Sequence, residues 1–529
     1  MSGKRFYITT PIYYVNDVPH IGHAYTTLAC DVMARFKRLD GYDVHFLTGT
    51  DEHGQKVEAA AAAAGLEPKA FTDRVSQAFR DLIPRMGYSP DNFIRTTEAR
   101  HYRASQALWS RLVAAGDIYL GKYAGWYSVR DEAFYAEGET AVGDDGKRRA
   151  TASGAEVEWV EEASYFFRLS AWQDRLLAFY EANPGFIAPE SRRNEVISFV
   201  RGGLHDLSVW RTTFKWGVPV PGDPAHIMYV WLDALTNYIT EAGYPDETAP
   251  NWKYWPADLH MVGKDIVRFH AVYWPAFLMS AGVAPPKRVF AHGWWTNEGQ
   301  KISKSLGNVI DTGALVDAYG LDQTRYFLLR EVPFGNDGDF RRDAMVQRMN
   351  SDLANAYGNL CQRVLSIVAK NCGAAVPAKG VLTEVDAALL GKAGGLLEIV
   401  RAKIDAQAFH EALIAIWDVI GDANRYVDAQ APWALAKTDP TRRDTVLWTL
   451  AETIRRVTLL TQPFMPTSTG RILDQLAVPT DRRGFDAYGD ELAPGAPLPA
   501  PQGVFPRFVD PAAAVAAPPA KPGKNAKKA

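Results

Sequence analysis

The chain has 529 residues and a mass of 58.5 kDa, which predicts three or four domains at about 150 residues each. Hydrophobic residues make up 47% and charged residues 22%, as in ordinary folded proteins, so neither disorder along the whole chain nor membrane spanning is expected. The 58 Lys and Arg residues and 61 Asp and Glu residues give a formal net charge of −3, which argues against non-specific coating of nucleic acid.

The three cysteines, Cys30, Cys361 and Cys372, form no CxxC pair. This spacing argues against a disulfide framework and against a cysteine-based zinc site, and it is typical of a reducing cytosol. The N-terminus runs straight into a predicted strand, without the apolar stretch of a signal peptide. We therefore expect a cytoplasmic protein with no membrane association.

The first elements predict a parallel α/β sheet. Residues 5–10 form a predicted strand, and a polar loop marked by prolines follows over residues 11–19. Apolar residues then recur every three or four positions, which predicts a helix over residues 20–41, before the next strand at residues 43–48. A further helix is predicted over residues 71–86. This order of strand, loop, helix and strand is the start of a Rossmann-type sheet.

The rest of the chain changes in character twice. Residues 119–225 are rich in glycine, tryptophan, tyrosine and charge, which indicates an insertion, after which the α/β pattern continues to about residue 335. Helical periodicity then predicts a bundle from about residue 346, with stretches at 346–367, 409–420 and 446–457. The last residues, 511–529, contain four lysines and almost no large apolar residue, so we expect a disordered basic tail there.

Two histidines mark the start of the first predicted helix, in the segment His20-Ile21-Gly22-His23. A helix N-terminus offers free N–H groups and a partial positive charge to phosphate, and Gly22 lets a nucleotide approach the backbone. His20 and His23 could donate hydrogen bonds to phosphate oxygens in a transition state. Alone, the motif also fits two ordinary histidines or a metal pair, although no third ligand is obvious nearby.

A second motif, Lys301-Ile302-Ser303-Lys304-Ser305, follows about 280 residues later and is flanked by glycines. Two lysines and two serines in a glycine-flanked loop can surround a polyphosphate, because lysine is a mobile point charge. Such a motif alone is usually a solvated surface loop. The two motifs together favour a nucleotide site in the α/β region.

This pair resembles the two signature sequences of class I aminoacyl-tRNA synthetases, and further segments narrow the resemblance to the methionyl-tRNA synthetases. The matching segments lie between about residues 5 and 480 and are PIYYVN (11–16), GTDEHG (49–54), YVWLDA (229–234) and GKDIVRFH (263–270). The resemblance implies ATP-dependent ligation of L-methionine to its initiator and elongator tRNAs through methionyl-adenylate, with release of pyrophosphate and AMP. Magnesium is expected to arrive with ATP.

The resemblance also implies an α/β fold class, with a Rossmann-type parallel sheet interrupted by a connective insertion and followed by a helical bundle. The expected domains are the first half of the catalytic domain (1–118), the connective insertion (119–225), the second catalytic half with the lysine loop (226–345), the helical anticodon-binding domain (346–482) and a low-complexity, partly disordered tail (483–529).

The family pattern implies a role for individual side chains. The ATP-binding residues are His20, Gly22, His23, Lys301, Ser303 and Lys304, and His20, His23, Lys301 and Lys304 are the catalytic groups among them. The methionine-binding residues are Ile12, Tyr14, Asp51, Trp231, Tyr238, Asp265, Ile266, Phe269 and His270. A thioether favours aromatic edges, and either Asp51 or Asp265 could hold the substrate ammonium. Without the flanking matches, the aromatic residues would instead be taken as ordinary core.

The predicted bundle contains a candidate anticodon site. Asn359 and Arg363 are four residues apart and share a helix face, and Trp433 follows a proline that is expected to end the preceding helix. An amide, a guanidinium and an indole could hydrogen-bond to and stack on unpaired bases. Each residue alone fits a surface pair or a buried tryptophan, and the functional interpretation depends on the family's anticodon-reading positions.

Two features depart from the family pattern. Many methionyl-tRNA synthetases carry zinc knuckles in the insertion, whereas residues 119–225 contain no cysteine, so we predict no structural zinc. Some members also carry a C-terminal dimerisation domain. Only about 45 low-complexity residues follow the predicted bundle here, so we predict a monomer without an obligate protein partner.

Three alternatives remain open at this point. A small-molecule nucleotidyltransferase would not need the helical bundle. A class I synthetase for another apolar amino acid is disfavoured by the pocket residues and by an insertion that is too short for an editing domain. An RNA-binding paralogue without activity has no reason to keep both histidines and both lysines.

Overall fold

The fold is given by a computed structural model that describes residues 3–15, 19–131, 133–211, 215–302 and 307–509. Its centre is a parallel sheet of six strands in the order β3-β2-β1-β14-β15-β9. The strands are β1 (Arg5–Tyr14), β2 (Asp43–Asp51), β3 (Asn92–Arg95), β9 (Ile187–Ala188), β14 (Leu259–Gly263) and β15 (Val289–His292). The chain turns from one half of the sheet to the other between β1 and β14, which is where ligands bind in open α/β sheets.

Helices cover both faces of this sheet, as the apolar strands require. They are α1 (Ile21–Leu39), α2 (Gln55–Ala63), α3 (Pro68–Arg85), α4 (Ala99–Ala114), α7 (Val230–Ala242), α8 (Trp274–Ser280), α9 (Thr312–Tyr319) and α10 (Leu321–Arg330). The predicted first helix and the predicted helix over residues 71–86 are confirmed by α1 and α3. The first strand is longer than predicted, because it continues to Tyr14 through the segment expected to be a loop.

The stretch predicted as an insertion contains both strands and helices. Its outer part is antiparallel and contains β4 (Ile118–Ser128), β5 (Ala133–Tyr135), β6 (Thr140–Val142), β7 (Arg148–Ala150), β8 (Glu158–Phe167), β10 (Leu207–Ser208), β11 (Trp210–Arg211), β12 (Pro219–Val220) and β13 (Asp223–Met228). The helices α5 (Gln173–Ala182) and α6 (Glu190–Arg201) flank β9, which pairs with β15. The stretch therefore contributes an edge strand to the central sheet, which the sequence analysis did not anticipate.

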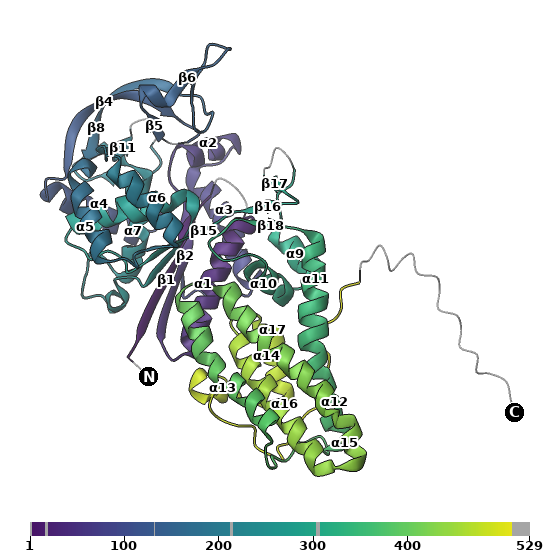
Figure 1. Cartoon of the computed structure of the whole chain (residues 1–529). Coiled ribbons are helices and arrows are strands. Elements are labelled where there is room, and N and C mark those ends of the chain that lie inside the picture. The colour runs from purple at the N-terminus through teal and green to yellow at the C-terminus, as the bar shows by residue number, and fades with distance from the viewer. Residues whose placement is uncertain (1–2, 16–18, 132, 212–214, 303–306, 510–529) are drawn as a thin grey trace.

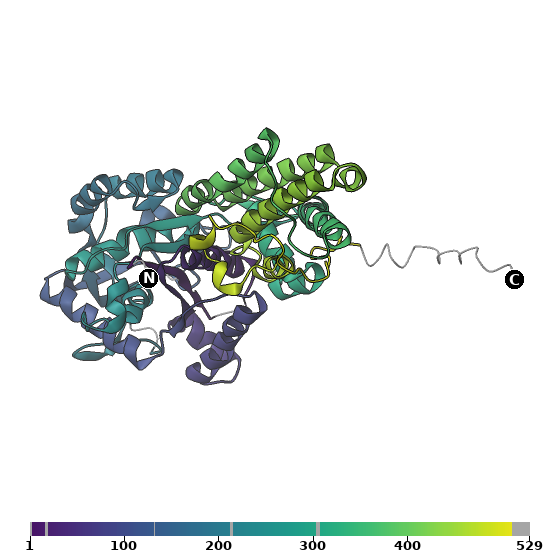
Figure 2. The ribbon, with the colours of Figure 1, turned by 90° about the horizontal axis from the view of Figure 1, so that it is seen from below.

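The predicted helical bundle is confirmed. After a small sheet of β16 (Trp295–Asn297), β17 (Gln300–Lys301) and β18 (Gly338–Phe340), the chain continues through α11 (Arg342–Gln347), a π-helical stretch (Arg348–Gly358), α12 (Asn359–Asn371), α13 (Glu384–Asp405), α14 (Phe409–Gln430), α15 (Pro432–Thr438), α16 (Pro440–Thr461) and α17 (Pro466–Gln475). The bundle and the outer sheet of the insertion lie at opposite ends of the molecule, with the central sheet between them (Figure 1). Seen from below, the bundle lies beside the sheet (Figure 2).

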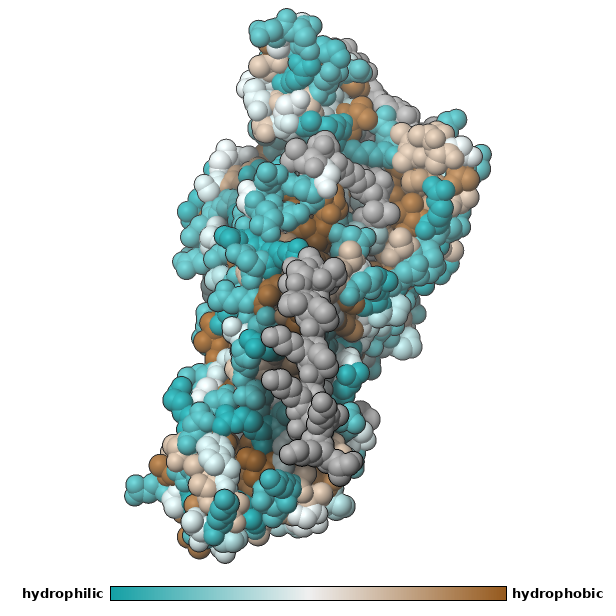
Figure 3. All heavy atoms as spheres, turned by 90° about the vertical axis from the view of Figure 1, so that its right-hand side faces the viewer, coloured by the Kyte–Doolittle hydropathy of each residue, from teal (hydrophilic) through white to brown (hydrophobic). Residues whose placement is uncertain are grey.

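One hydrophobic core joins α1 to the bundle, because Met33 and Phe36 belong to the same buried cluster as Ile404 and Val457. The face shown in Figure 3 is largely hydrophilic, with hydrophobic residues in several separate groups. No helix in the described part of the chain is both long and apolar enough to cross a membrane.

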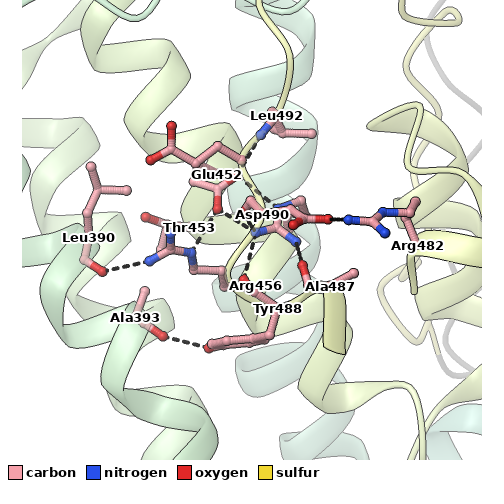
Figure 4. A network of polar contacts seen from close by, with 12 residues as sticks. Leu390, Ala393, Glu452, Thr453, Arg456, Arg482, Ala487, Tyr488, Asp490 and Leu492 are labelled. Atoms are coloured by element: carbon pink, nitrogen blue, oxygen red, sulfur yellow. Dashed lines mark hydrogen bonds and ion pairs between the residues drawn. The ribbon is translucent and has the colours of Figure 1, made fainter. Parts of the chain in front are cut away.

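Residues 484–508, which we call the strap, pack back onto the bundle although the sequence analysis assigned them to the tail. Phe485, Leu492 and Phe505 are buried in the core cluster. Polar contacts hold the first part of the strap, where the buried Arg455 donates to the carbonyls of Ala487 and Tyr488, among others. Figure 4 shows this network, in which Glu452 accepts from the backbone N–H of Leu492 and the Tyr488 hydroxyl donates to the Ala393 carbonyl. The predicted disordered tail, residues 511–529, lies outside the described residues.

Candidate active site

A cavity of about 350 Å³ opens at the carboxyl ends of the central strands. The ends of β1, β2 and β15 contribute to its wall, together with the segment after β14, the first turn of α1 and one face of α7. Its lining includes eleven residues predicted from the sequence, namely Ile12, Tyr14, His20, Gly22, His23, Asp51, Trp231, Tyr238, Asp265, Ile266 and His270. Residues more than 250 positions apart therefore converge at the turning point of the sheet.

His20 and His23 form a reciprocal cap at the start of α1. The Nδ1 atom of His20 accepts a hydrogen bond from the Gly22 backbone N–H at 3.1 Å, and Nδ1 of His23 accepts from the His20 N–H at 3.2 Å. The two rings lie 3.9 Å apart. Because both Nδ1 atoms accept, each neutral ring carries its proton on Nε2 as a donor.

The electrostatics of this turn favour a neutral His23 imidazole. Burial and the neighbouring His20 hold the pKa of His23 well below its ordinary value. A Cβ on Gly22 would lie only 2.9 Å from Cε1 of His20, so glycine is needed for the His20 ring to fold over the helix start. The first turn of α1 thus presents N–H donors and no negative charge, as an anion site requires.

The wall on α7 is aromatic and uncharged. The Tyr238 hydroxyl lies 2.7 Å from Nε2 of His270, whose Nδ1 lies 3.0 Å from the Ile266 carbonyl oxygen. A carbonyl only accepts, so His270 donates through Nδ1 and accepts from Tyr238 through Nε2. Burial lowers the pKa of His270 to about 4, which keeps this ring neutral at pH 7. The wall therefore suits an apolar, polarizable group.

The two candidate carboxylates differ in their surroundings. Asp51 is 7% exposed at the end of β2. Asp265 is exposed, and its Oδ1 accepts a hydrogen bond from the indole N–H of Trp294 at 3.1 Å. The buried carboxylate is the better partner for a desolvated ammonium group, because a charge–charge contact is stronger away from water.

Phe269 lies outside the lining of this cavity. Its ring stacks on Trp231 with the centroids 3.6 Å apart, and it borders a neighbouring cavity of about 810 Å³. Phe269 therefore packs against the Trp231 ring, and its predicted contact with methionine stays a prediction. Lys301 also lies outside the lining, as an exposed residue of β17, and the predicted Ser303 and Lys304 lie outside the described residues.

Several lining residues were missed by the sequence analysis. They are Pro11, Tyr13, Thr26, Val230, Ala234, Leu235, Gly263, His292 and Trp294. The helical spacing of Ala234 between Val230 and Tyr238 was a usable signal, since positions four apart share a face. His292 ends β15, and a polar residue at the carboxyl end of a predicted parallel strand could have been proposed on that ground.

The three residues predicted to read an anticodon lie near one another on the bundle. The guanidinium carbon of Arg363 lies 5.5 Å from the centre of the Trp433 ring, and Arg363 donates to Asp428 at 2.7 Å. Trp433 is 47% exposed and lies in the first turn of α15, where a loop was expected. Asn359 is exposed one helical turn before Arg363 on α12. The group combines a stacking surface with hydrogen-bond donors.

Comparisons with known proteins agree with this geometry. The family model of class I tRNA synthetases (M) matches residues 6–365, and that of the anticodon binding domain of methionyl tRNA ligase matches residues 376–515. The methionine–tRNA ligase of Mesorhizobium japonicum is 60% identical over 528 residues, which is 99% of this chain and 100% of the relative. That of Brucella suis is 60% identical over 511 residues, covering 96% and 99% of the two chains.

Solved structures agree as well. Mycobacterium tuberculosis methionyl-tRNA synthetase in complex with methionyl-adenylate is 58% identical, with a TM-score of 0.93 over 95% of this chain and 100% of that chain. Its apo form gives a TM-score of 0.88 at 55% identity, over 96% and 99% of the two chains. The chain therefore belongs to the class I methionyl-tRNA synthetases, the methionine–tRNA ligases.

Proposed function

We propose that the 350 Å³ cavity forms methionyl-adenylate from methionine and ATP before the acyl group passes to tRNA. The observation that carries this proposal is that one cavity combines the donor-rich start of α1 with an aromatic wall and a buried carboxylate. The related M. tuberculosis enzyme, which has been solved with methionyl-adenylate, supports the same assignment. The reaction then takes place at the carboxyl ends of β1 and β14, where the strand order of the central sheet reverses direction.

In this proposal, methionine lies between Asp51 and the α7 wall. The Asp51 carboxylate holds the ammonium group, and Trp231, Tyr238 and His270 surround the thioether. Sulfur makes favourable contacts with aromatic edges, and the uncharged Tyr238–His270 pair can approach it without burying a charge. The side chains of Ile12, Tyr14 and Ile266 complete the apolar wall. Asp265, already bonded to Trp294, has a secondary role at the rim.

The phosphates of ATP take the other end of the cavity. Attack of the methionine carboxylate on the α-phosphate puts charge on the phosphate oxygens, and hydrogen bonds from the Nε2–H groups of His20 and His23 and the partial charge at the start of α1 can stabilise it. Gly22 allows close approach. We assign Lys301, Ser303 and Lys304 to the leaving pyrophosphate on the basis of their motif, with magnesium entering on ATP. Positioning and electrostatics supply most of the catalysis in such phosphate chemistry.

The bundle reads the anticodon through Asn359, Arg363 and Trp433. The exposed indole offers a stacking face, and Arg363 beside it offers donors to base edges. We further propose that the enzyme acts as a monomer in the cytoplasm. Light scattering tests the first point, and a mass near twice 58.5 kDa would contradict it.

Amino-acid-dependent exchange of pyrophosphate into ATP, measured with each of the twenty amino acids and without tRNA, tests the adenylation step. We expect strong exchange with methionine alone. Asp51→Asn should raise the methionine KM, whereas the matched change Asp317→Asn, at a 70% exposed carboxylate on α9, should leave it unchanged. Exchange with another amino acid would overturn the pocket assignment, and no exchange would overturn the proposed reaction.

A further inference from the structure

A buried carboxylate connects two walls of the cavity. Asp233 lies on α7 two residues after Trp231, and His53 lies two residues after Asp51. Nδ1 of His53 lies 2.6 Å from Oδ2 of Asp233, and the two side chains are only 2% and 1% exposed. The loop that carries Asp51 is therefore tied directly to the helix that carries Trp231 and Tyr238.

The second oxygen of Asp233 is also occupied. Nε2 of His101, on α4, lies 2.7 Å from Oδ1, and the His101 side chain is fully buried. Burial alone would raise the pKa of the Asp233 carboxyl, but the two imidazoles hold it at about 2. The group is thus a carboxylate that accepts one N–H from each histidine, and its orientation is fixed from both sides.

The neighbouring residues of the loop are anchored elsewhere. Glu52 accepts two hydrogen bonds from Arg95, at the end of β3, at 2.6 and 2.9 Å. Trp216, which lies between β11 and β12, donates to the Glu52 carbonyl at 2.5 Å. Among these anchors, the bond between His53 and Asp233 is the one that reaches α7. It ties the segment after β2 to the helix that carries the aromatic wall.

We propose that Asp233 is a positioning residue for methionine, which acts through His53 to fix the Asp51 carboxylate relative to Trp231 and Tyr238. The inference rests on the proposed role of Asp51 in binding the ammonium group. A short carbon chain joins the ammonium group and the sulfur of methionine. The distance between Asp51, which binds the ammonium, and the aromatic wall, which surrounds the sulfur, must therefore stay constant. A displacement of about 1 Å in such a site can cost on the order of a hundredfold in rate.

The test compares two buried carboxylates of the same helix. Asp233→Asn keeps the shape of the side chain but removes its charge and one acceptor. The control is Glu241→Gln, because Glu241 is 2% exposed and accepts from His45 and Arg100 at 2.8 Å, yet does not line the cavity. Both changes weaken a buried network on α7. Only the first one touches the link to the Asp51 loop.

The readout is pyrophosphate exchange, with separate KM values for methionine and ATP. We expect Asp233→Asn to raise the methionine KM about tenfold and to leave the ATP KM within about twofold, while Glu241→Gln leaves both within about twofold. A parallel rise of both KM values, or an unchanged methionine KM, would overturn the inference. Failure of the unmodified enzyme to activate methionine would instead contradict the proposed function.

A second pair of variants keeps the test decisive if Asp233→Asn does not fold. His53→Ala removes the link from the other side and should give the same selective rise in the methionine KM. His53→Asn places an amide nitrogen where Nδ1 lies and should restore most of the affinity. Equal KM values in His53→Ala and the unmodified enzyme, or no recovery in His53→Asn, would contradict a positioning role.

Discussion

Arg325 and Asp31 form an ion pair at 2.6 Å in which neither side chain is exposed to solvent. Asp31 belongs to α1, which begins at the two histidines, and Arg325 belongs to α10. The guanidinium also donates to the carbonyls of Pro463 and Phe464, between α16 and α17. One side chain therefore connects the first helix of the catalytic region to the bundle.

Replacing Arg325 should destabilise the whole molecule. Arg325→Met leaves Asp31 as a buried charge with fewer partners, which typically costs about 3–5 kcal/mol. Denaturant unfolding measures this loss. The control, Arg341→Ala, breaks an exposed pair with Asp343 and should cost no more than about 1 kcal/mol. Similar losses in the two variants would contradict a special role for the buried pair.

Acid should weaken the fold around the cavity. Burial lowers the pKa of four histidines in and beside it, namely His23, His260, His270 and His292. Below pH 6.5 the unfolded chain therefore binds more protons than the folded chain, so the free energy of unfolding falls as the pH falls. The contribution of His270 is complete above pH 6.5 and declines by about 3 kcal/mol towards pH 4.

Unfolding measured at several pH values between 7 and 4.5 checks this expectation. In His270→Gln, the pH dependence should be shallower by up to about 1.4 kcal/mol per pH unit, because one titrating group is gone. His205→Gln is a suitable control, since His205 is exposed. An unchanged slope in His270→Gln would show that this ring is not neutral in the folded state.

Truncating Trp433 should separate the two steps of the reaction. Trp433→Ala removes an exposed stacking surface worth about 1–3 kcal/mol per base, so kcat/KM for tRNA aminoacylation should fall by about tenfold or more. Pyrophosphate exchange should not change, because α15, which carries Trp433, lies at the end of the bundle remote from the central sheet (Figure 1). Val381→Ala, at a 92% exposed position of the same region, should affect neither activity. Equal losses in exchange and aminoacylation would contradict an anticodon role.

The insertion should hold its shape without zinc. Within the described ranges, no group of three or more His, Cys, Asp or Glu residues is arranged to bind a metal ion. Arg148 instead lies over the Trp126 ring at 4.4 Å and pairs with Glu137 at 2.8 Å. Because residues 119–225 contain no cysteine, elemental analysis should find far less than one zinc per chain, and a chelator should leave Tm unchanged. One zinc per chain would contradict this prediction.

Much of the cavity could be predicted from sequence because its residues lie in contiguous motifs. The segments around His20, Asp51 and Trp231 each follow a strand or begin a helix. The sequence therefore indicates both the chemistry of these residues and their place in the fold. Trp294 was missed because its contact with Asp265 depends on how two neighbouring strands end in space. The contact of Phe269 with methionine was inferred from the family motif, which does not reveal that its ring stacks on Trp231 outside the cavity lining, and this contact stays a prediction.

The strap escaped prediction for a different reason. Its buried residues, Phe485, Leu492 and Phe505, are widely spaced and lie almost entirely in irregular backbone. Periodicity, the main signal for buried elements, is absent there. A segment rich in proline, glycine and alanine is expected to pack poorly by itself. Its burial can be recognised only when the surface that it covers is known. Here the bundle supplies that surface, including the indole N–H of Trp448, which donates to the Leu492 carbonyl.

This packing also sets an order of events during protein synthesis. Carbonyls that accept from Arg455 and Trp448 come from the strap, so we expect a growing chain to finish the bundle only after the strap has left the ribosome. A copy that terminates before the strap loses these carbonyl partners, although Glu452 still pairs with Arg455, and it leaves apolar surface uncovered. We expect such a copy to open more easily than the longer chain and to be cleaved faster by proteases. Translation through the strap is thereby made a condition for a durable molecule.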